Sequence, residues 1–591
     1  MKTINKFLYV IFLSGLLGLS SCDSFLDKEY DASLSEEKVF ANATLTRQFL
    51  TNIYVNLPDG IGVYGDPQFL GASRDCMTDN ATSFWGLHYY NKINTDSYTS
   101  NDHPLLAFWN INFTGIRKCN QFLKNVSPNV ISNATVAGDD NRLYDRYRAE
   151  ATFMRALFHF ELVAYFGDAP ILEDVILSMD DQEAMNLTRT NAAEVLKWVA
   201  DQCDAVKDVL PFRYASEGNW GRVNGASAYA LKSRALLYRA SLLHNPSNDV
   251  TRWEEAAQAA SDFITKNATQ TSPFKLYDNY QKSFYETPYQ NDETILCRSI
   301  WYTNVIETSL LPEGFSGCAG RTNPTQNFVD CFEMNDGKTI QEAEVLGEYD
   351  PQDPYKNRDP RLEATIFHHG SEWGRADYNE RRKIDVHFNS GTDKGEDYRG
   401  SFGGTFTGYY LKKFVNPDMV MQDKKTFAHA WTIYRYAEIL LNYAEAANEA
   451  GGPTYKATGA TLNAKDAADL VRDRSDMPAL PTTLDQTAFR KRIRNERRVE
   501  LSFEDHRFFD LRRWRAYDGV TKENELTKPY SEQLLNIYGT EVTLVNSNPV
   551  YTYATNANLE GRVFNVPKNY LFPIPYTETQ KAPNLGQNPG W

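Results

Sequence analysis

The chain has 591 residues, a formal net charge of −15 and an aromatic content of 13%. Its acidic balance argues against a nucleic-acid-binding protein, which needs a basic face to displace the counterions of phosphates. The cysteines are irregularly spaced without a Cys-x-x-Cys pair, so neither a zinc site nor a disulfide framework is expected. We predict no metal and no cofactor. The sequence leaves open the disulfide state of Cys76, Cys119, Cys203, Cys297, Cys318 and Cys331, of which Cys318 and Cys331 could pair in an exported protein.

The first 34 residues have the pattern of an export signal followed by a tether. Lys2 and Lys6 precede an uncharged apolar run of about 14 residues, which is too short to span a bilayer. A leucine and two serines then lead to Cys22, an arrangement that resembles the lipobox of bacterial lipoproteins, where the thiol is lipidated. The sequence predicts a signal peptide over residues 1–21 and a lipidated tether over 22–34. The alternative is an ordinary signal peptide followed by a chance cysteine.

Helical patterns dominate the next part of the chain. Residues 141–166 carry one apolar stripe at i, i+3/i+4 spacing, and this helix is predicted to end at Gly167, before Pro170. Alanine-rich helices of about 15–20 residues favour tetratricopeptide-type pairs, which bury their faces only by stacking. Further helices are predicted over 35–54, 105–126, 192–210, 226–243 and 253–264.

Two stretches interrupt this pattern. Residues 60–104 are rich in Gly, Asn, Asp, Ser and aromatics, and long loops of this kind are usually functional or disordered. From about 270 to 428 no long helical stripe survives. Helices resume over 430–450, 464–474 and 486–503, and the chain is irregular again over 516–591.

The predicted fold is mainly α: a tetratricopeptide-like helix-pair scaffold, or α-α superhelix, with an irregular, loop-rich ligand-binding lobe. We expect an N-terminal helical region over 35–270. An insertion over 271–429 forms the ligand lobe, and a C-terminal region over 430–591 completes the scaffold.

Aromatic residues in the polar loops are the best candidates for ligand contact. Sugar rings present C–H faces that stack on aromatic rings, and their hydroxyls need polar side chains nearby. An aromatic residue in a helical stripe is more often part of the core, whereas one in a polar loop has less core to fill, so its exposure is expected. The candidates are Trp85, Tyr89, Tyr90, Asn91, Tyr98, Trp301, Tyr302 and Trp373.

Catalytic and cofactor motifs are weak. The segment from Gly60 to Gly65 has G-x-G-x-x-G spacing, but a predicted helix rather than a strand precedes it. No G-x-S-x-G or H-E-x-x-H motif occurs, and nothing singles out two carboxylates for glycoside hydrolysis. No catalytic residue is therefore predicted, and a helical glycoside hydrolase is a minor alternative. The arginines of 494–515 alternate with acidic residues, which indicates intramolecular ion pairs rather than an anion site.

Short motifs along the whole chain carry a family resemblance. They are Arg148–Pro170, Gly221–Gly225, Asn323–Gly337, Asn357–Leu362, Tyr434–Ala446, Arg494–Trp514, Pro573–Pro575 and Gln587–Gly590. In combination, and together with Cys22, they resemble the SusD/RagB family of outer-membrane nutrient-binding lipoproteins.

The resemblance implies a fold and a role. The expected fold has four tetratricopeptide-like pairs and an irregular lobe. The expected role is non-catalytic binding of a polysaccharide or oligosaccharide and its delivery to a SusC-like TonB-dependent transporter. The protein would be lipid-anchored in the outer membrane of a Gram-negative bacterium and would face the exterior. The alternatives are a peptide-binding partner of the same kind of transporter and a tetratricopeptide-type scaffold protein. The family motifs do not mark the binding residues.

Overall fold

The computed structural model describes most of the chain from residue 35 onward. The described residues are 35–60, 72–83, 89–132, 135–136, 139–176, 182–286, 291–298, 301–398, 404–520, 533–555 and 561–591. Cys22 and Trp85, named above as candidates, lie outside them.

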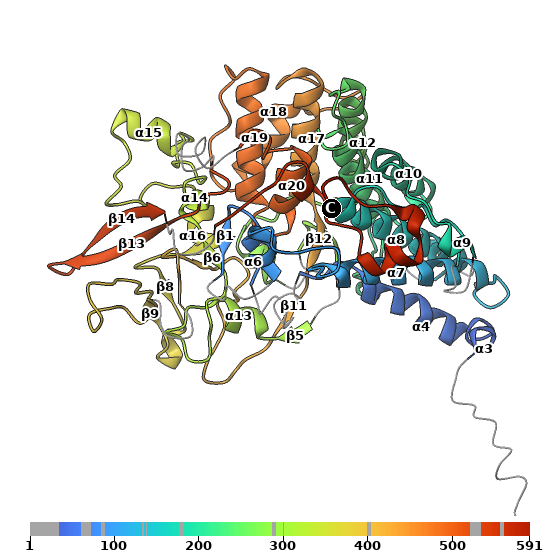
Figure 1. The fold of residues 1–591 in the computed structure, drawn as a ribbon, viewed down its shortest axis with the longest axis horizontal. Coiled ribbons are helices and arrows are strands. Elements are labelled where there is room, and N and C mark those ends of the chain that lie inside the picture. Colours follow the sequence, from blue (N-terminus) through green and yellow to red (C-terminus); the bar gives the residue numbers. More distant parts are fainter. Residues whose placement is uncertain are drawn as a thin grey trace, which may run out of the picture.

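Helices that pack mostly against their neighbours in the chain form one side of the molecule, here called the helical scaffold (Figure 1). α7 packs on α8, α8 on α10, α10 on α11 and α11 on α12, and α17 packs on both α18 and α19. This confirms the predicted mainly helical fold. The scaffold helices are α3 (Glu36–Phe40), α4 (Ala43–Ile53), α7 (Leu106–Asn125), α8 (Leu143–Phe166), α10 (Ala192–Val206), α11 (Gly225–Ala240), α12 (Val250–Ala268), α17 (Tyr436–Gly451), α18 (Ala464–Asp473) and α19 (Gln486–Glu500).

Small residues allow the scaffold helices to approach closely. Gly115 of α7 faces α8, and a Cβ atom at this position would lie 2.5 Å from the ring of Phe158. A side chain there would have to displace a fully buried ring, so α7 and α8 require a glycine at this crossing. α11 uses alanine in the same way, because five of its alanines are buried: Ala226, Ala228, Ala230, Ala235 and Ala240.

The residues between α12 and α17 form most of a second part, here called the irregular lobe. α12 and α17 pack directly against each other although the lobe separates them in sequence. Every sheet among the described residues is a two-stranded antiparallel ribbon. The lobe includes α13 (Val305–Leu310), α14 (Gln326–Val329), α15 (Ile340–Leu346), α16 (Arg361–Thr365), β4 (Thr294–Cys297), β5 (Trp301–Thr303), β7 (Ile366–Phe367), β8 (Glu372–Trp373), β9 (Arg382–Lys383), β10 (Tyr410–Leu411), β11 (Phe427–His429) and β12 (Thr432–Arg435).

Two sequence predictions of local structure are wrong. The helix expected from residue 430 begins at Tyr436, because residues 432–435 form β12 and pair with β4. The C-terminal part is not wholly irregular, since β13 (Tyr538–Val545) and β14 (Asn548–Thr555) form a hairpin. Its turn residues Asn546 and Ser547 both have positive φ, as a tight two-residue hairpin turn requires.

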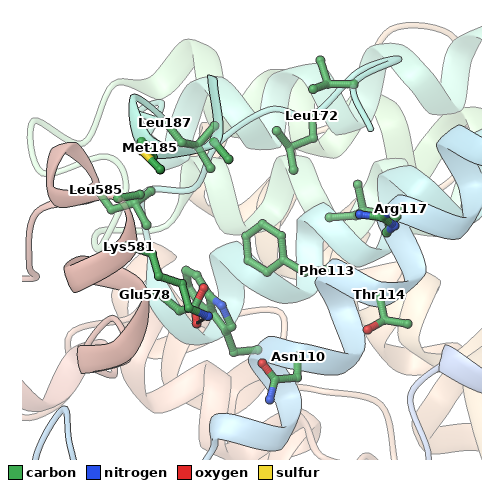
Figure 2. A pocket seen from close by; sticks show the side chains of 15 residues that line it. Asn110, Phe113, Thr114, Arg117, Leu172, Met185, Leu187, Glu578, Lys581 and Leu585 are labelled. Atoms are coloured by element: carbon green, nitrogen blue, oxygen red, sulfur yellow. Dashed lines mark hydrogen bonds and ion pairs between the residues drawn. The ribbon is translucent and has the colours of Figure 1, made fainter. Parts of the chain in front are cut away.

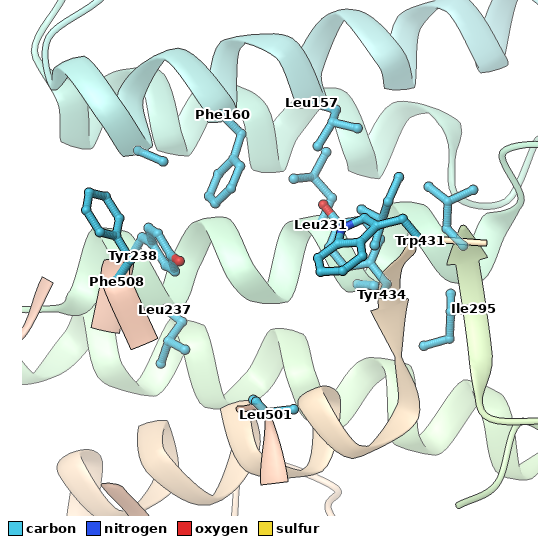
Figure 3. Close-up of a cluster of buried hydrophobic side chains, with 14 of the residues drawn as sticks. Leu157, Phe160, Leu231, Leu237, Tyr238, Ile295, Trp431, Tyr434, Leu501 and Phe508 are labelled. Carbon is cyan, nitrogen blue, oxygen red and sulfur yellow. The ribbon is translucent and has the colours of Figure 1, made fainter. Parts of the chain in front are cut away.

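The hydrophobic core runs from the scaffold into the lobe without a break (Figure 3). Phe160 of α8 and Tyr238 of α11 pack with ring centroids 5.1 Å apart. Tyr434 of β12 and Ile295 of β4 belong to the same cluster. Trp431, which precedes β12, packs so closely on Gly60 that a Cβ there would lie 2.3 Å from the indole. The two parts are therefore joined by one continuous apolar contact.

A network of buried ion pairs also joins scaffold and lobe. Glu500, at the end of α19, is fully buried and pairs with Arg435 of β12 at 2.7 Å and with Arg361 of α16 at 3.0 Å. Arg474, just after α18, is its third partner. Burial by itself raises the pKa of the Glu500 carboxyl, but the three guanidinium groups outweigh it and hold that pKa well below its usual range. Glu500 is thus ionised in the folded protein and bonded to both parts.

The arginine-rich segment 494–515 is structural, as predicted, although its partners are mostly distant in sequence. Arg507 bonds Asp79 at 2.8 Å, and Arg513 pairs with Glu445 of α17. The spacing also suggested ion pairs at i, i+3/i+4, and one of these forms: the Arg513 guanidinium lies 2.8 Å from the Asp510 carboxylate. The segment therefore connects separate elements rather than only bracing its own helix.

Glu161 of α8 gives the first testable prediction, because it borders a small polar cavity of about 40 Å³. The nearby cations are already paired, Arg74 with Asp505 at 2.6 Å and Arg234 with Glu438 at 2.6 Å. Burial raises the pKa of Glu161 to about 7. The folded state therefore favours the protonated carboxyl, and the stability that Glu161 contributes below pH about 4.5 is lost as the pH rises through 7.

We expect Glu161→Gln to be more stable than the unmodified protein at pH 8, by up to about 3 kcal/mol, and nearly equal to it at pH 4.5. Urea unfolding at the two pH values measures this difference. Glu344→Gln, at an exposed position on α15, is the matched control and should change little at either pH. A Glu161→Gln effect that is the same at both pH values would contradict the assignment.

Candidate functional site

An exposed tyrosine on a short ribbon of the lobe is the centre of the candidate site. β5 and β11 pair antiparallel, with Tyr302 opposite Ala428. The side chain of Tyr302 is 80% exposed. Its cross-strand neighbour is a small residue, so one face of the phenol ring is not covered from across the ribbon. Large exposed aromatic residues usually have a partner or ligand to contact.

The opposite face of this ribbon is anchored in the protein. His429, the last residue of β11, lies 3.0 Å from Glu307 of α13, and both side chains are buried. Glu307 also accepts a hydrogen bond from the backbone N–H of Asn416 at 3.2 Å. Because side chains alternate along a strand, a ribbon held inward at His429 directs Tyr302 outward.

A polar loop beside the ribbon extends the surface. The amide of Asn304 donates to the carbonyl of Lys424 at 3.1 Å, which ties the loop to the end of β5. The backbone N–H groups of Met421 and Gln422 donate to the Glu380 carboxylate at 3.1 and 3.0 Å. The loop is therefore held at two points, at Lys424 beside the end of β5 and at Met421 and Gln422 beside the segment 376–380.

We define the Tyr302 surface as β5, β11, the loop 416–426 and Tyr378. Tyr378 is 41% exposed, and the Arg375 guanidinium lies 5.7 Å from its ring centroid. Residues 422–426 are all exposed and polar, and they carry an amide, a carboxylate, two ammonium groups and a hydroxyl. Aromatic faces combined with such groups can stack on a sugar ring and hydrogen-bond its hydroxyls.

Three of the predicted site residues are buried, so the expectation that they are exposed is wrong. The Tyr90 hydroxyl donates to the carbonyl of Ala72 at 2.8 Å. Tyr98 packs on Trp591 with centroids 4.8 Å apart, and Trp373 packs edge-on against Phe367 at 5.2 Å. These rings fill local core under the loops, which composition alone did not reveal.

The other candidates are placed less fully. Asn91 is half-buried in α6 (Tyr89–Asn94), and its backbone carbonyl accepts a hydrogen bond from Thr95. The backbone places Tyr89 in α6 and Trp301 in β5 opposite His429, while their side chains lie outside the described part. Trp301 and Tyr302 are consecutive residues of β5, whereas Tyr90 lies in α6 and Trp373 in β8.

Sequence reasoning missed Tyr378 and the loop at 422–426. The loop had a signal, since five consecutive polar residues separate Met421 from the aromatic strand at Phe427. Tyr378 also lies in a short polar segment, between Gly374 and Arg381. The sequence does not show that either belongs to one surface with Tyr302, because the contacts of the loop with Glu380 and Asn304 depend on the folded lobe.

Metal, thiol and membrane features do not mark a second site in the described part of the chain. No group of three or more His, Cys, Asp or Glu side chains there could hold a metal ion. Its six cysteines are all buried and form no disulfide, so Cys318 and Cys331 do not pair. Burial raises the pKa of the Cys318 thiol to about 12. None of the helices described is both long and apolar enough to cross a bilayer.

Comparison with protein families matches nearly the whole body of the chain. Residues 299–591 match the model of the SusD family, and residues 24–237 match a model described as starch-binding, associating with outer membrane. SusD-like protein P25 of Formosa agariphila is 24% identical over 543 residues, covering 89% of this chain and 92% of that protein.

Solved structures share the fold. A SusD-like protein of Bacteroides fragilis matches with a TM-score of 0.72 and 24% identity, covering 95% of this chain and 99% of that one. A SusD-like carbohydrate-binding protein of the same species has a TM-score of 0.69 and 24% identity, covering 93% and 99%. Surface glycan-binding protein A of Bacteroides uniformis has a TM-score of 0.59 and 21% identity, covering 92% and 98%. With the scaffold, the lobe and both family models in agreement, the chain belongs to the SusD family.

Proposed function

We propose that this protein captures a polysaccharide or oligosaccharide at the outer face of the outer membrane and delivers it to a SusC-like TonB-dependent transporter. Proteins of the SusD family are non-catalytic binding proteins, and the family is associated with the outer membrane. The proposal adds a ligand class, a binding surface, an anchor and a partner to that family assignment.

The observation that carries the glycan proposal is the Tyr302 surface. Tyr302 offers an exposed ring on a ribbon that the buried contact between His429 and Glu307 holds in place. Polar groups with both donors and acceptors lie next to it on the loop 422–426. A rigid aromatic platform loses little conformational entropy on binding, which favours it as the main contact for a repeating polymer.

The anchor proposal rests on the sequence around Cys22. A lipidated Cys22 would hold the body of the protein at the membrane through a tether that joins it at Ser35. Tethering raises the effective concentration of captured ligand near a transporter in the same membrane without any new contact.

The proposal is tested by measuring binding of the mature chain to plant, host and microbial polysaccharides, and to peptides, by affinity electrophoresis and calorimetry. We expect one class of glycan to bind. Binding of peptides alone would overturn the glycan proposal in favour of the peptide-binding alternative. The anchor is tested separately: Cys22→Ser should release the protein from the membrane fraction of the native cells.

A further inference from the structure

A long apolar groove lies on the helical scaffold, in the part of the molecule that holds α7. It has a volume of about 580 Å³ and is formed by α7, α9 (Gln182–Met185), α22 (Tyr576–Lys581) and the residues that follow them (Figure 2). Phe113 projects into the middle of the groove, Leu187 and Met185 flank it from the α9 segment, and Leu585 closes one end. Met185 is 45% exposed.

The lining of this groove does not suit a sugar. Apart from the charged groups at its rim, it consists mainly of Trp, Phe, Ile, Leu, Val, Ala and Met side chains. Sugar hydroxyls would lose their hydration there without enough polar partners, which costs free energy. Apolar side chains of a peptide would instead gain free energy by leaving water for this lining.

A basic stripe leads from the groove toward the beginning of the described chain. Arg117 lines the groove, and Lys124 follows seven residues later, so both lie on one face of α7 and both are exposed. At the end of this helix the amide of Asn125 donates to the carboxylate of Glu36 at 2.6 Å. The first described residue, Ser35, caps α3 and therefore lies beside the C-terminal end of the stripe.

We propose that residues 23–34 of the tether dock along this stripe and insert Phe25 and Leu26 into the groove. The tether carries the acidic residues Asp23, Asp27, Glu29 and Asp31 and only one lysine, in complement to the basic stripe. Its length is sufficient. Phe113 is about 18 Å along α7 from Asn125, while the nine residues from Ser35 back to Leu26 span up to about 30 Å when extended.

Docking would set the orientation of the protein on the membrane. A free tether from Ser35 to Cys22 reaches about 43 Å, whereas a tether held at Phe25 leaves only about 10 Å between the groove and the lipid. The face with α7, α9 and α22 would then lie toward the membrane, and the ligand lobe would be held in a restricted set of orientations. This consequence rests on the proposed anchoring at Cys22, while the docking itself does not.

Cysteine cross-linking tests the docking in the mature chain carrying Cys22→Ser. The native cysteines of the described part are buried, so introduced cysteines react selectively. With Phe25→Cys and Met185→Cys, we expect a short bismaleimide to cross-link the pair at least about ten times faster than Phe25→Cys with Val55→Cys, because docking raises the effective concentration. Val55 is the control because it is 56% exposed and lies in the short helix Tyr54–Asn56, which Asn56 ties to Ile111 of α7, on the side of the molecule where the tether joins.

A second measurement keeps the test independent of the cross-linker. Phe25→Asp combined with Leu26→Asp should increase amide hydrogen exchange in α9 and α22 and leave exchange in α15 unchanged. Equal cross-linking of the two cysteine pairs, or unchanged exchange in α9 and α22, would overturn the docking. Glycan affinity is measured on the same samples, and docking predicts that it does not change. A failure of the docking is thereby distinguished from a failure of the proposed glycan binding.

Discussion

Replacing Glu500 by glutamine should lower the free energy of unfolding by about 3–5 kcal/mol, the largest stability effect we expect from a conservative change. Glutamine keeps the size and shape of the side chain and removes only its charge. The carboxylate of Glu500 bonds three buried arginines, Arg361, Arg435 and Arg474. After the substitution a neutral amide would face the same three guanidinium groups. Removing the charge of one partner in a buried ion pair leaves the opposite charges less well compensated. The free energy of unfolding then falls by more than it does when a surface ion pair is removed.

The dependence of this effect on pH follows from the direction of the pKa shift. The Glu500 pKa is held well below its usual range in the folded protein, so its stabilisation is fully present above the unfolded-state pKa of about 4.3. That stabilisation is lost as the pH falls toward the folded-state pKa. The difference between the unmodified protein and Glu500→Gln should be constant from pH 6 to 8 and should shrink below about pH 4.3.

Urea unfolding followed by circular dichroism measures both effects, with Glu344→Gln as the exposed control. The control should change stability by no more than about 0.5 kcal/mol. A loss below about 1 kcal/mol for Glu500→Gln would mean that the three arginines find other partners after the change. Arg361 and Arg435 have such partners in Asp359 and Glu293, so the experiment decides whether the network tolerates the loss of its shared member.

The sequence was sufficient for the scaffold because its helices follow from local periodicity. The stripe in 141–166 corresponds to α8, and its predicted end at Gly167 is the observed one. The lobe was predicted only as irregular, because its strands are two to four residues long and pair with distant segments, as β5 does with β11. Such pairings leave no periodic signal, and β12 was even expected to be the start of a helix.

The candidate site was less predictable than the scaffold, because it also depends on contacts between segments that are distant in the sequence. Composition selected aromatic residues in polar loops, and Tyr302 met the expectation of exposure. Tyr90, Tyr98 and Trp373 have similar sequence surroundings but are covered by segments such as the C-terminal Trp591, which packs on Tyr98. Exposure depends on what packs over a loop, and that information lies far away in the chain.

Replacing Tyr302 by alanine should raise the Kd for the bound glycan about ten- to thirtyfold, which corresponds to about 1.4–2 kcal/mol. The ring is exposed on the ribbon, so a bound glycan would make its main apolar contact with it. Tyr302→Phe keeps the ring and removes the hydroxyl, so it should retain most of the affinity if stacking dominates. Calorimetry with the glycan identified in the binding panel measures all three proteins.

Tyr576→Ala is the matched control, because this tyrosine is 48% exposed but belongs to α22 of the scaffold. Stability should be nearly unchanged in each variant, since exposed side chains contribute little to folding. If Tyr302→Ala and Tyr576→Ala weaken binding equally, the Tyr302 surface is not the binding site. If Tyr302→Phe loses as much affinity as Tyr302→Ala, the hydroxyl carries the contact, and the site reads the ligand by hydrogen bonding rather than by stacking. The two substitutions at one position therefore separate the location of the site from its chemistry.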